Sequence, residues 1–223
     1  MELDLQVTPE RTILDLRSLG VPHLRVLGRY RYLRAHPPLA DHSHPGMMEI
    51  SYLARGTQNY WMGKKCFRMS GGDLFVTLPD EPHSTGPDPE HCGLMYWMIL
   101  ELPDKPFNFM GLPPGQAEAY WDGLRSFPHR HCSAGSGLQP ILESVFRTAI
   151  SPKTPLQQAR MHLGILKYLL EIITLAQRDQ VRALSPEMAA GVDHIEHHLE
   201  EPLPVERLAR ESGLSVSRFK SRF

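Results

Sequence analysis

The stretch DHSHPGMMEISYLARG, residues 41–56, carries two histidines and a glutamate close together. His42 and His44 are separated by one residue, so on an extended strand both side chains project from the same face. Glu49 has the wrong parity for an uninterrupted strand, but Pro45 and Gly46 lie between and can reset the phase through a turn. The stretch therefore predicts two imidazoles and a carboxylate on one face of a β-sheet.

A fourth side chain of this kind follows a later strand. In GGDLFVTLPDEPH, residues 71–83, Pro79 and Pro82 restrict the turn and hold His83 in a defined direction. Three neutral imidazoles and a carboxylate suit a divalent transition metal, Zn, Ni, Mn or Fe(II), with positions left open for water or a substrate. The predicted ligands are His42, His44, Glu49 and His83. Alternatively, these groups line a pocket and hydrogen-bond an organic effector or each other without a metal.

The same two stretches resemble a known family. HSHPGMMEISYLARG, residues 42–56, resembles the first motif of the cupin superfamily, His-x-His, four residues, Glu, six residues, Gly, which ends here at Gly56. GGDLFVTLPDEPH resembles the second motif. The resemblance implies a cupin β-barrel, and it implies that His83 completes a three-histidine, one-glutamate set as in metal-binding cupins.

The composition places the chain among globular proteins. Of its 223 residues, 41% are hydrophobic and 22% are charged, which argues against wholesale disorder and against a fibrous repeat. No apolar run approaches the ~18 residues of a membrane span, and the start MELDLQV lacks the features of a signal peptide, so we expect a cytoplasmic protein. Three scattered cysteines without a C-x-x-C pair argue against a disulfide framework.

The residue pattern divides the chain into three regions of an α+β protein. Residues 12–102 contain short apolar segments separated by Gly and Pro, with a hairpin turn expected at Gly63 and Lys64, so we predict an effector-binding β-barrel over residues 1–105. Its candidate walls are Tyr52, Tyr60, Trp61, Phe75, Tyr96, Trp97 and Met98, although alternation alone does not show which of them face inward. Residues 138–150 and the residues from 155 onward have apolar side chains at helical spacing. We predict a helical linker over 106–184 that forms a homodimer.

The last region predicts a pair of short helices. Helix start signals cluster at Ser185, and in VERLARESGLSVSRFKSRF, residues 205–223, Gly213 suits a turn with positive φ and Ser215 can cap a second helix. This helix-turn-helix pattern predicts contacts with double-stranded DNA by Ser215, Ser217, Arg218, Lys220, Ser221 and Arg222. The alternative is two surface helices of a bundle.

This region also resembles a known family. Leu208, Ala209, Gly213, Ser215, Ser217 and Phe223 match a pattern similar to the first helix-turn-helix of AraC-type bacterial transcription regulators. That family joins a cupin-like effector domain to a DNA reader with two such units, so we expect residues 185–223 to be a truncated domain that binds DNA weakly. The resemblance implies a regulator that senses a small molecule rather than an enzyme. The alternative is a metal-dependent cupin enzyme, an isomerase or oxygenase, which uses the ion as a Lewis acid.

Overall fold

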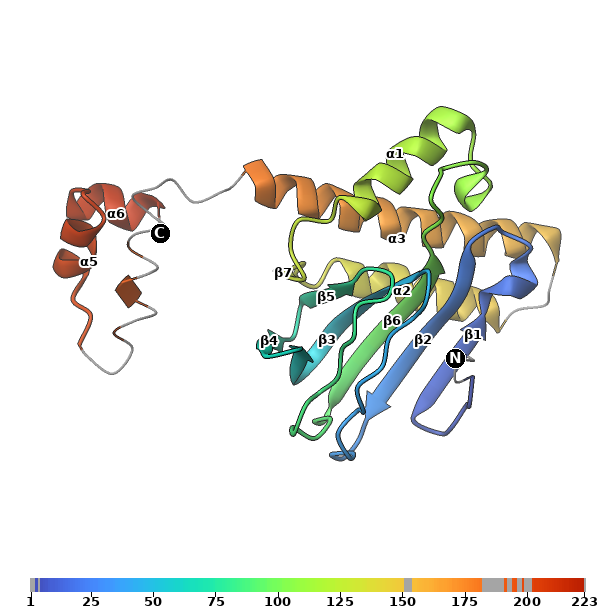
Figure 1. Ribbon diagram of the computed structural model, residues 1–223, viewed down its shortest axis with the longest axis horizontal. Helices are drawn as coiled ribbons and strands as arrows, with labels where there is room; N and C mark the ends of the chain where they lie inside the picture. The colour runs from blue at the N-terminus through green and yellow to red at the C-terminus, as the bar shows by residue number, and fades with distance from the viewer. Residues whose placement is uncertain are drawn as a thin grey trace. The chain divides into compact units, whose positions relative to one another are not determined.

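The computed structural model describes residues 3, 5–150, 154–181, 191, 194–195, 198 and 202–222. The chain divides into two compact units, Met1–Gln177 and Arg178–Phe223, which are described separately (Figure 1). The helix start predicted at Ser185 lies outside the described residues.

The first unit is built on an antiparallel sheet. Its strands are β1 (Arg11–Asp15), β2 (Leu24–Tyr32), β3 (Met47–Met62), β4 (Lys65–Ser70), β5 (Asp73–Thr77), β6 (Gly93–Glu101) and β7 (His131–Ser133). They pair in the order β1-β2-β6-β3-β5-β7, and β4 pairs with the end of β3. The hairpin turn predicted at Gly63 is confirmed, with a φ of 57° at this glycine. No ladder joins β1 to β7 among the described strands, so closure into a barrel stays a prediction.

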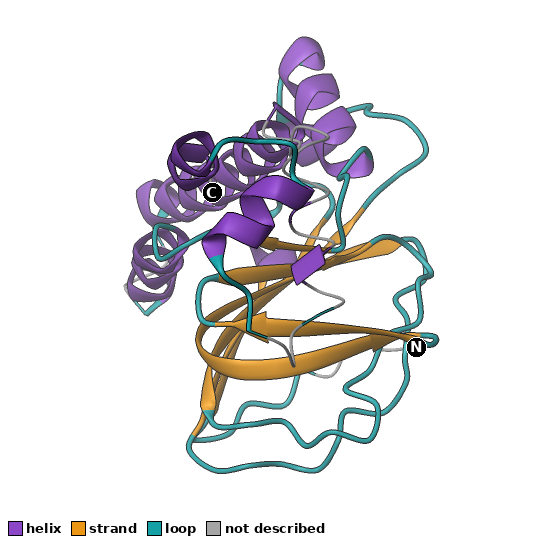
Figure 2. Ribbon diagram, turned by 90° about the vertical axis from the view of Figure 1, so that its left-hand side faces the viewer, coloured by secondary structure: helices purple, strands orange, loops and turns teal. Residues whose placement is uncertain are grey.

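Helices cover one face of this sheet (Figures 1 and 2). They are α1 (Pro114–Arg125), α2 (Leu138–Ala149) and α3 (Pro155–Val181), together with the short 3-10 helices η1 (Leu16–Leu19) and η2 (Phe109–Gly111). The helices expected from residues 138 and 155 are confirmed, and with the antiparallel sheet they give the predicted α+β class. None of the helices in the described part of the chain is long and apolar enough to cross a membrane.

The two faces of the sheet face different surroundings because successive side chains of a strand point in opposite directions. On β6, Leu94, Tyr96, Met98 and Leu100 pack into the core shared with α2 and α3. The alternate residues, Met95, Trp97 and Ile99, belong to a second core on the opposite face. Both faces of β6 are therefore buried, which explains the continuous apolar run of this strand.

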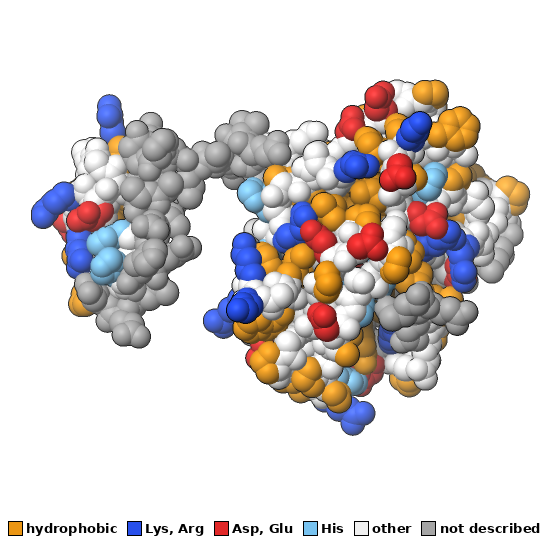
Figure 3. Space-filling view, viewed as in Figure 1, with side chains coloured by type: hydrophobic (Ala, Val, Ile, Leu, Met, Phe, Trp, Pro, Cys, Tyr) orange, Lys and Arg blue, Asp and Glu red, His pale blue; other side chains and the backbone are white. Residues whose placement is uncertain are grey.

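Charges are interspersed on the surface of the first unit. Figure 3 shows Lys and Arg side chains among Asp and Glu side chains on the visible face, without a broad patch of one sign. This mixture agrees with the formal net charge of -1 for the chain.

The second unit contains a pair of short helices, α5 (Val205–Glu211) and α6 (Val216–Arg222). The turn between them contains Gly213 with a φ of 64°, and the Arg218 N–H donates to Ser215 Oγ at 3.4 Å, so the predicted turn and cap are confirmed. Leu208, Ala209 and Phe219 form a small core between the helices, and Phe223 lies outside the described residues.

Candidate metal centre and cavity

The structure brings the four predicted ligand residues together. The His42 N–H donates to the His83 carbonyl at 3.1 Å, and the His83 N–H donates to the His42 carbonyl at 2.9 Å, so two distant segments meet at these histidines. One donor atom from each of His42, His44, Glu49 and His83 lies within 4.8 Å of the other three. Among the described residues no other group of at least three His, Cys, Asp or Glu side chains gathers in this way.

A turn brings Glu49 to the histidines. Gly46 has a φ of 65°, and the Met47 N–H donates to the His44 carbonyl at 3.1 Å, directly before β3 begins. The turn changes the phase between the His42 and His44 segment and the strand that carries Glu49. The carboxylate therefore reaches the imidazoles despite the odd spacing.

The Glu49 carboxylate contacts two of the histidines and a serine. His44 Nε2 lies 2.8 Å from its Oε2, His83 Nε2 lies 3.4 Å from the same oxygen, and the Ser51 hydroxyl donates to Oε1 at 2.9 Å. Burial alone would raise the pKa of Glu49, but its contacts with His44 and His83 outweigh burial and hold that pKa well below its usual range. The carboxylate is therefore charged at neutral pH and can act as a metal ligand.

Backbone carbonyls fix the tautomers of two histidines. His42 Nδ1 lies 2.9 Å from the Ala40 carbonyl, and His83 Nδ1 lies 3.1 Å from the Glu81 carbonyl. A carbonyl only accepts, so each Nδ1 carries a proton, and in the neutral ring each Nε2 then presents a lone pair, the arrangement that metal-ligating histidines use. Burial also lowers the pKa of His42, which favours its neutral form, whereas at His83 the contact with the Glu49 carboxylate outweighs burial and raises the pKa.

One atom of the cluster lacks a hydrogen bond. His83 Nε2 is buried, and its contact with Glu49 Oε2 at 3.4 Å does not meet the geometry of a hydrogen bond, so among the described residues it has no hydrogen-bond partner. A buried polar atom left in this state costs about 1–3 kcal/mol, and a metal ion would satisfy it. Donor atoms around one tetrahedral zinc ion lie roughly 3.4 Å apart, given Zn–N bonds of about 2.1 Å. The donor atoms of the cluster lie within 4.8 Å of one another, so they would move closer together to hold such an ion.

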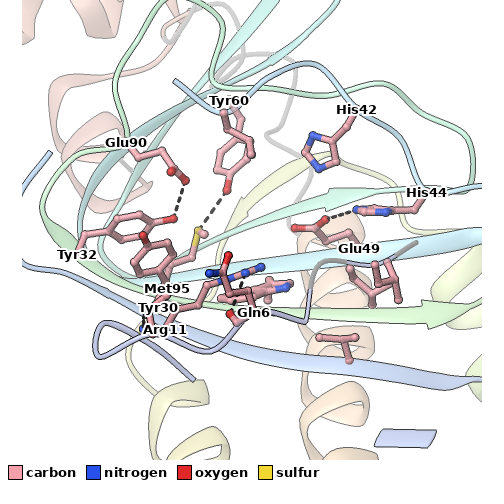
Figure 4. Close-up of a pocket in the computed structure, with 16 residues that line it drawn as sticks. Gln6, Arg11, Tyr30, Tyr32, His42, His44, Glu49, Tyr60, Glu90 and Met95 are labelled. Atoms are coloured by element: carbon pink, nitrogen blue, oxygen red, sulfur yellow. Dashed lines mark hydrogen bonds and ion pairs between the residues drawn. The ribbon is translucent and has the colours of Figure 1, made fainter. Parts of the chain in front are cut away.

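The cluster opens into a cavity of about 450 Å³ (Figure 4). Its walls include the apolar side chains of Val26, Leu39, Met95, Trp97 and Ile99. Of the predicted wall residues, Tyr60 and Trp97 line the cavity, whereas Tyr52, Tyr96 and Met98 pack on the helical side of the sheet. Trp61 and Phe75 are not among the lining residues.

A second polar group lines the cavity away from the histidines, at Arg11, Tyr30, Tyr32 and Glu90 (Figure 4). The Tyr32 hydroxyl donates to Glu90 Oε1 at 2.6 Å, and the rings of Tyr30 and Tyr32 stack with centroids 3.8 Å apart. On β6, Ile99 pairs with Glu49 whereas Met95 pairs with Tyr30, so these two positions lie roughly 13 Å apart along the strand.

The predicted DNA-contact residues lie on or beside α6. Ser215, Ser217, Arg218 and Lys220 are exposed. Ser221 and Arg222 belong to α6, but their side chains lie outside the described part of the structure.

A scan against protein families matches residues 29–170 to the AraC-like ligand binding domain. The chain belongs to this family. The matched range contains the four clustered residues and most of the cavity wall. The cluster also resembles the metal site of cupins, which agrees with the motif resemblance of its sequence.

The chain is similar to several solved structures at low identity. KdgF from Halomonas sp. is 21% identical, with 44% of this chain and 86% of that chain covered and a TM-score of 0.33. Bacillus subtilis oxalate decarboxylase, a protein with Mn(II) centres, is 18% identical, with 41% and 24% covered and a TM-score of 0.32. The AraC-like transcriptional activator CuxR is 10% identical, with 86% and 68% covered and a TM-score of 0.40. A search of curated proteins found no match. At these TM-scores the likenesses do not decide between a regulator and an enzyme.

Proposed function

We propose that the protein is a transcription regulator of the AraC type, in which the first unit binds a small-molecule effector and the helix pair α5–α6 contacts DNA. The observation that supports this most strongly is the match of residues 29–170 to a ligand-binding domain, because the same residues enclose most of the cavity. The cavity volume of about 450 Å³ falls within the range of small-molecule sites.

The cavity walls favour an effector with polar groups at both ends and an apolar centre. His42, His44 and Glu49 form one polar group and Tyr30 and Glu90 belong to the other, with the apolar side chains of β2 and β6 between them. A divalent ion held by the four-residue cluster would supply a Lewis acid that binds an oxygen of the effector. Apolar walls with a few polar anchors are typical of small-molecule sites.

The exposed side chains of α6 support DNA binding by the second unit. Ser217 and Lys220 are exposed on a short helix that follows a capped turn, the position from which a recognition helix reaches base edges and phosphates. The packed core of Leu208, Ala209 and Phe219 fixes the two helices of the pair against one another.

Exposed leucines on α3 support the homodimer. Leu156, Leu163 and Leu170 recur every seventh position, and their exposed fractions are 63%, 65% and 49%. A heptad stripe of leucines is typical of a helix that packs against a second helix, and a symmetric dimer would bury it. The dimer predicts twice the monomer mass of 25.3 kDa in sedimentation.

A metal-dependent enzyme is the second candidate, and the donor set favours it. Four protein ligands leave positions open for a substrate on a six-coordinate ion. The two candidates differ in what happens to the bound molecule and in whether DNA binds.

Two linked assays distinguish the candidates. In the first, metabolites are screened by thermal shift with and without Zn(II) or Mn(II), and each hit is incubated with the protein and recovered for mass spectrometry. A regulator returns the hit unchanged, whereas an enzyme converts it.

In the second assay, a DNA sequence is selected from a random library, and its affinity is measured by fluorescence anisotropy with and without the hit. We expect Lys220→Gln to weaken DNA binding, and the effector to change DNA affinity by about 5- to 150-fold. Conversion of the hit, together with no retained DNA, would contradict the proposed regulator.

A further inference from the structure

We propose that Arg130 is a positioning residue for the candidate metal ligand His83 and that it acts through Glu81. This inference rests on the metal centre proposed above. The Arg130 side chain comes from the segment between α1 and β7, 49 positions from Glu81 in the sequence.

Glu81 holds the turn that carries His83 in two ways. Its backbone carbonyl accepts the His83 Nδ1 proton at 3.1 Å and thereby sets the orientation of the ring. Its Oε2 accepts the Leu78 N–H at 2.8 Å, and its own N–H donates to the Leu78 carbonyl at 3.2 Å, which closes the turn. The position of Glu81 therefore decides where His83 Nε2 points.

Arg130 holds the remaining oxygen of this carboxylate. Its Nη2 and Nε donate to Glu81 Oε1 at 2.6 and 3.2 Å, and the two side chains are 25% and 27% exposed. The Arg130 carbonyl accepts the Val76 N–H at 2.8 Å, so the backbone of Arg130 is fixed to β5. The guanidinium thus connects the sheet to the turn.

The turn needs such support because part of its backbone is strained. Asp80 has a φ of 66°, a left-handed conformation that is uncommon for a residue with a side chain. The Asp80 N–H donates to the His44 carbonyl at 3.2 Å, so the turn also touches the first histidine segment. Without the Arg130 contact, Glu81 loses its cationic partner, and relaxation of the turn would move the carbonyl that orients His83.

A positioning role for Arg130 and a purely electrostatic effect of its charge predict opposite changes in metal affinity when Arg130 is replaced. Arg130 is a cation near a site for a divalent cation, so removing its charge would tighten metal binding if charge alone mattered. If Arg130 positions His83, removing it weakens metal binding. The double variant Glu81→Gln, Arg130→Gln leaves the net charge unchanged, so a charge-only account predicts wild-type affinity for it.

The experiment is a calorimetric titration of the full chain with Zn(II) after chelator treatment. We expect about 10- to 100-fold weaker binding for Arg130→Gln and for the double variant, the range for loss of a supporting partner of a metal ligand. Arg130→Lys keeps the charge and should partly restore affinity. The matched control is Arg25→Gln, which breaks a comparable ion pair with Glu101, whose two side chains are 33% and 36% exposed, and it should bind Zn(II) like wild type. Wild-type or tighter binding by Arg130→Gln would overturn the proposal.

A second measurement separates this inference from the metal centre itself. In the metal-free protein, nitrogen NMR of His83 should show the Nδ1–H tautomer in wild type and in Arg25→Gln, and a mixture of tautomers in Arg130→Gln and Arg130→Lys. If wild type binds no Zn(II), the metal centre is wrong, and the tautomer result still decides whether Arg130 positions His83. An unchanged His83 signal in folded Arg130→Lys and Arg130→Gln would contradict the proposal that Arg130 positions His83.

Discussion

Replacement of His83 by leucine should remove the response to metal while changing the metal-free stability little. His83 has a side chain that is 2% exposed, and its Nε2 is buried without a hydrogen bond from the described residues. Leucine fills a similar volume without placing a polar atom at this position, so a large cavity is not expected.

In the metal-free protein, the effect of His83→Leu on the free energy of unfolding is the sum of opposing contributions. The substitution removes the unsatisfied Nε2, which costs wild type about 1–3 kcal/mol, and it also removes the hydrogen bond from Nδ1 to Glu81, which contributes about 0.5–1.5 kcal/mol. Glu49 loses one neighbour but keeps His44 at 2.8 Å and the Ser51 hydroxyl at 2.9 Å. The free energy of unfolding should therefore change by no more than about 2.5 kcal/mol.

The effect of His83→Leu on the stabilisation by Zn(II) is larger. Zn(II) at one hundred times its dissociation constant stabilises wild type by about 2.7 kcal/mol, which raises the melting temperature by roughly 5–11 °C for a chain of this size. A loss of only 100-fold in affinity would reduce this gain to about 0.4 kcal/mol, or roughly 1–2 °C. Removal of a direct ligand should cost at least as much.

The assay is calorimetric melting of chelator-treated protein with and without added Zn(II). His131→Leu is the matched control, because His131 also faces a carboxylate, with Nε2 3.1 Å from Asp73, but lies outside the cluster. We expect this control to keep the full metal-induced shift. A full shift in His83→Leu would show that His83 is not a ligand and would refute the reasoning.

Three further substitutions test the fold around the cavity. A Cβ at Gly28 would lie 2.1 Å from the Trp97 ring, so Gly28→Ala should lower the free energy of unfolding by about 1–3 kcal/mol in urea titrations; an unchanged midpoint would contradict the packing. Tyr96→Phe removes the hydroxyl that donates to Glu143, a charged acceptor, and should cost about 1.5–3 kcal/mol by the same measurement. Burial raises the pKa of Glu90 above its ordinary value of 4.5 and outweighs the hydrogen bond from Tyr32, which lowers it. The folded state therefore holds this proton more tightly than the unfolded state does. As the pH rises through the raised pKa, the contribution of Glu90 to stability falls. Glu90→Gln should therefore gain stability relative to wild type as the pH rises from 4.5 through the raised pKa, and a difference that stays constant with pH would count against burial of this charge.

Three residues of the cluster, His42, His44 and Glu49, could be identified from sequence because their spacing is local, whereas His83 was joined to them by the restricted turn that precedes it and by the resemblance to the second cupin motif. His42 and His44 needed the period of a strand, and Glu49 needed a turn at Gly46, whose φ is 65°. The helices from residues 138 and 155 were predictable because their apolar residues recur at helical spacing. The sequence of the helix pair α5–α6 likewise specified its turn at Gly213 and its cap at Ser215.

Other features depend on contacts between distant segments. Helix α1 lies within the helical region predicted for residues 106–184, but its bounds were not predicted, because it buries few side chains, such as Ala117 and Leu124, and has Pro114 and Gly115 in its first turn. The second polar group of the cavity was also missed, because Tyr32 and Glu90 are 58 positions apart and meet through the pairing of β2 with β6. The alternation of Tyr30 and Tyr32 on β2 was a usable signal, since both side chains must lie on one face.

The central strand β6 connects the cavity to the helices through a single backbone. Trp97 faces the cavity, whereas the preceding residue, Tyr96, donates to Glu143 on α2. Arg29, which pairs with Tyr96 across the sheet, donates to the same carboxylate at 3.1 Å. A backbone shift of β6 that accommodates a ligand beneath Trp97 would therefore also move the Tyr96 hydroxyl that contacts α2. A regulator needs an element whose two states are biased by the bound effector. In the proposed regulator this group of polar contacts is where occupancy of the cavity would reach the helices, because it joins the sheet to α2 by hydrogen bonds that depend on direction as well as distance.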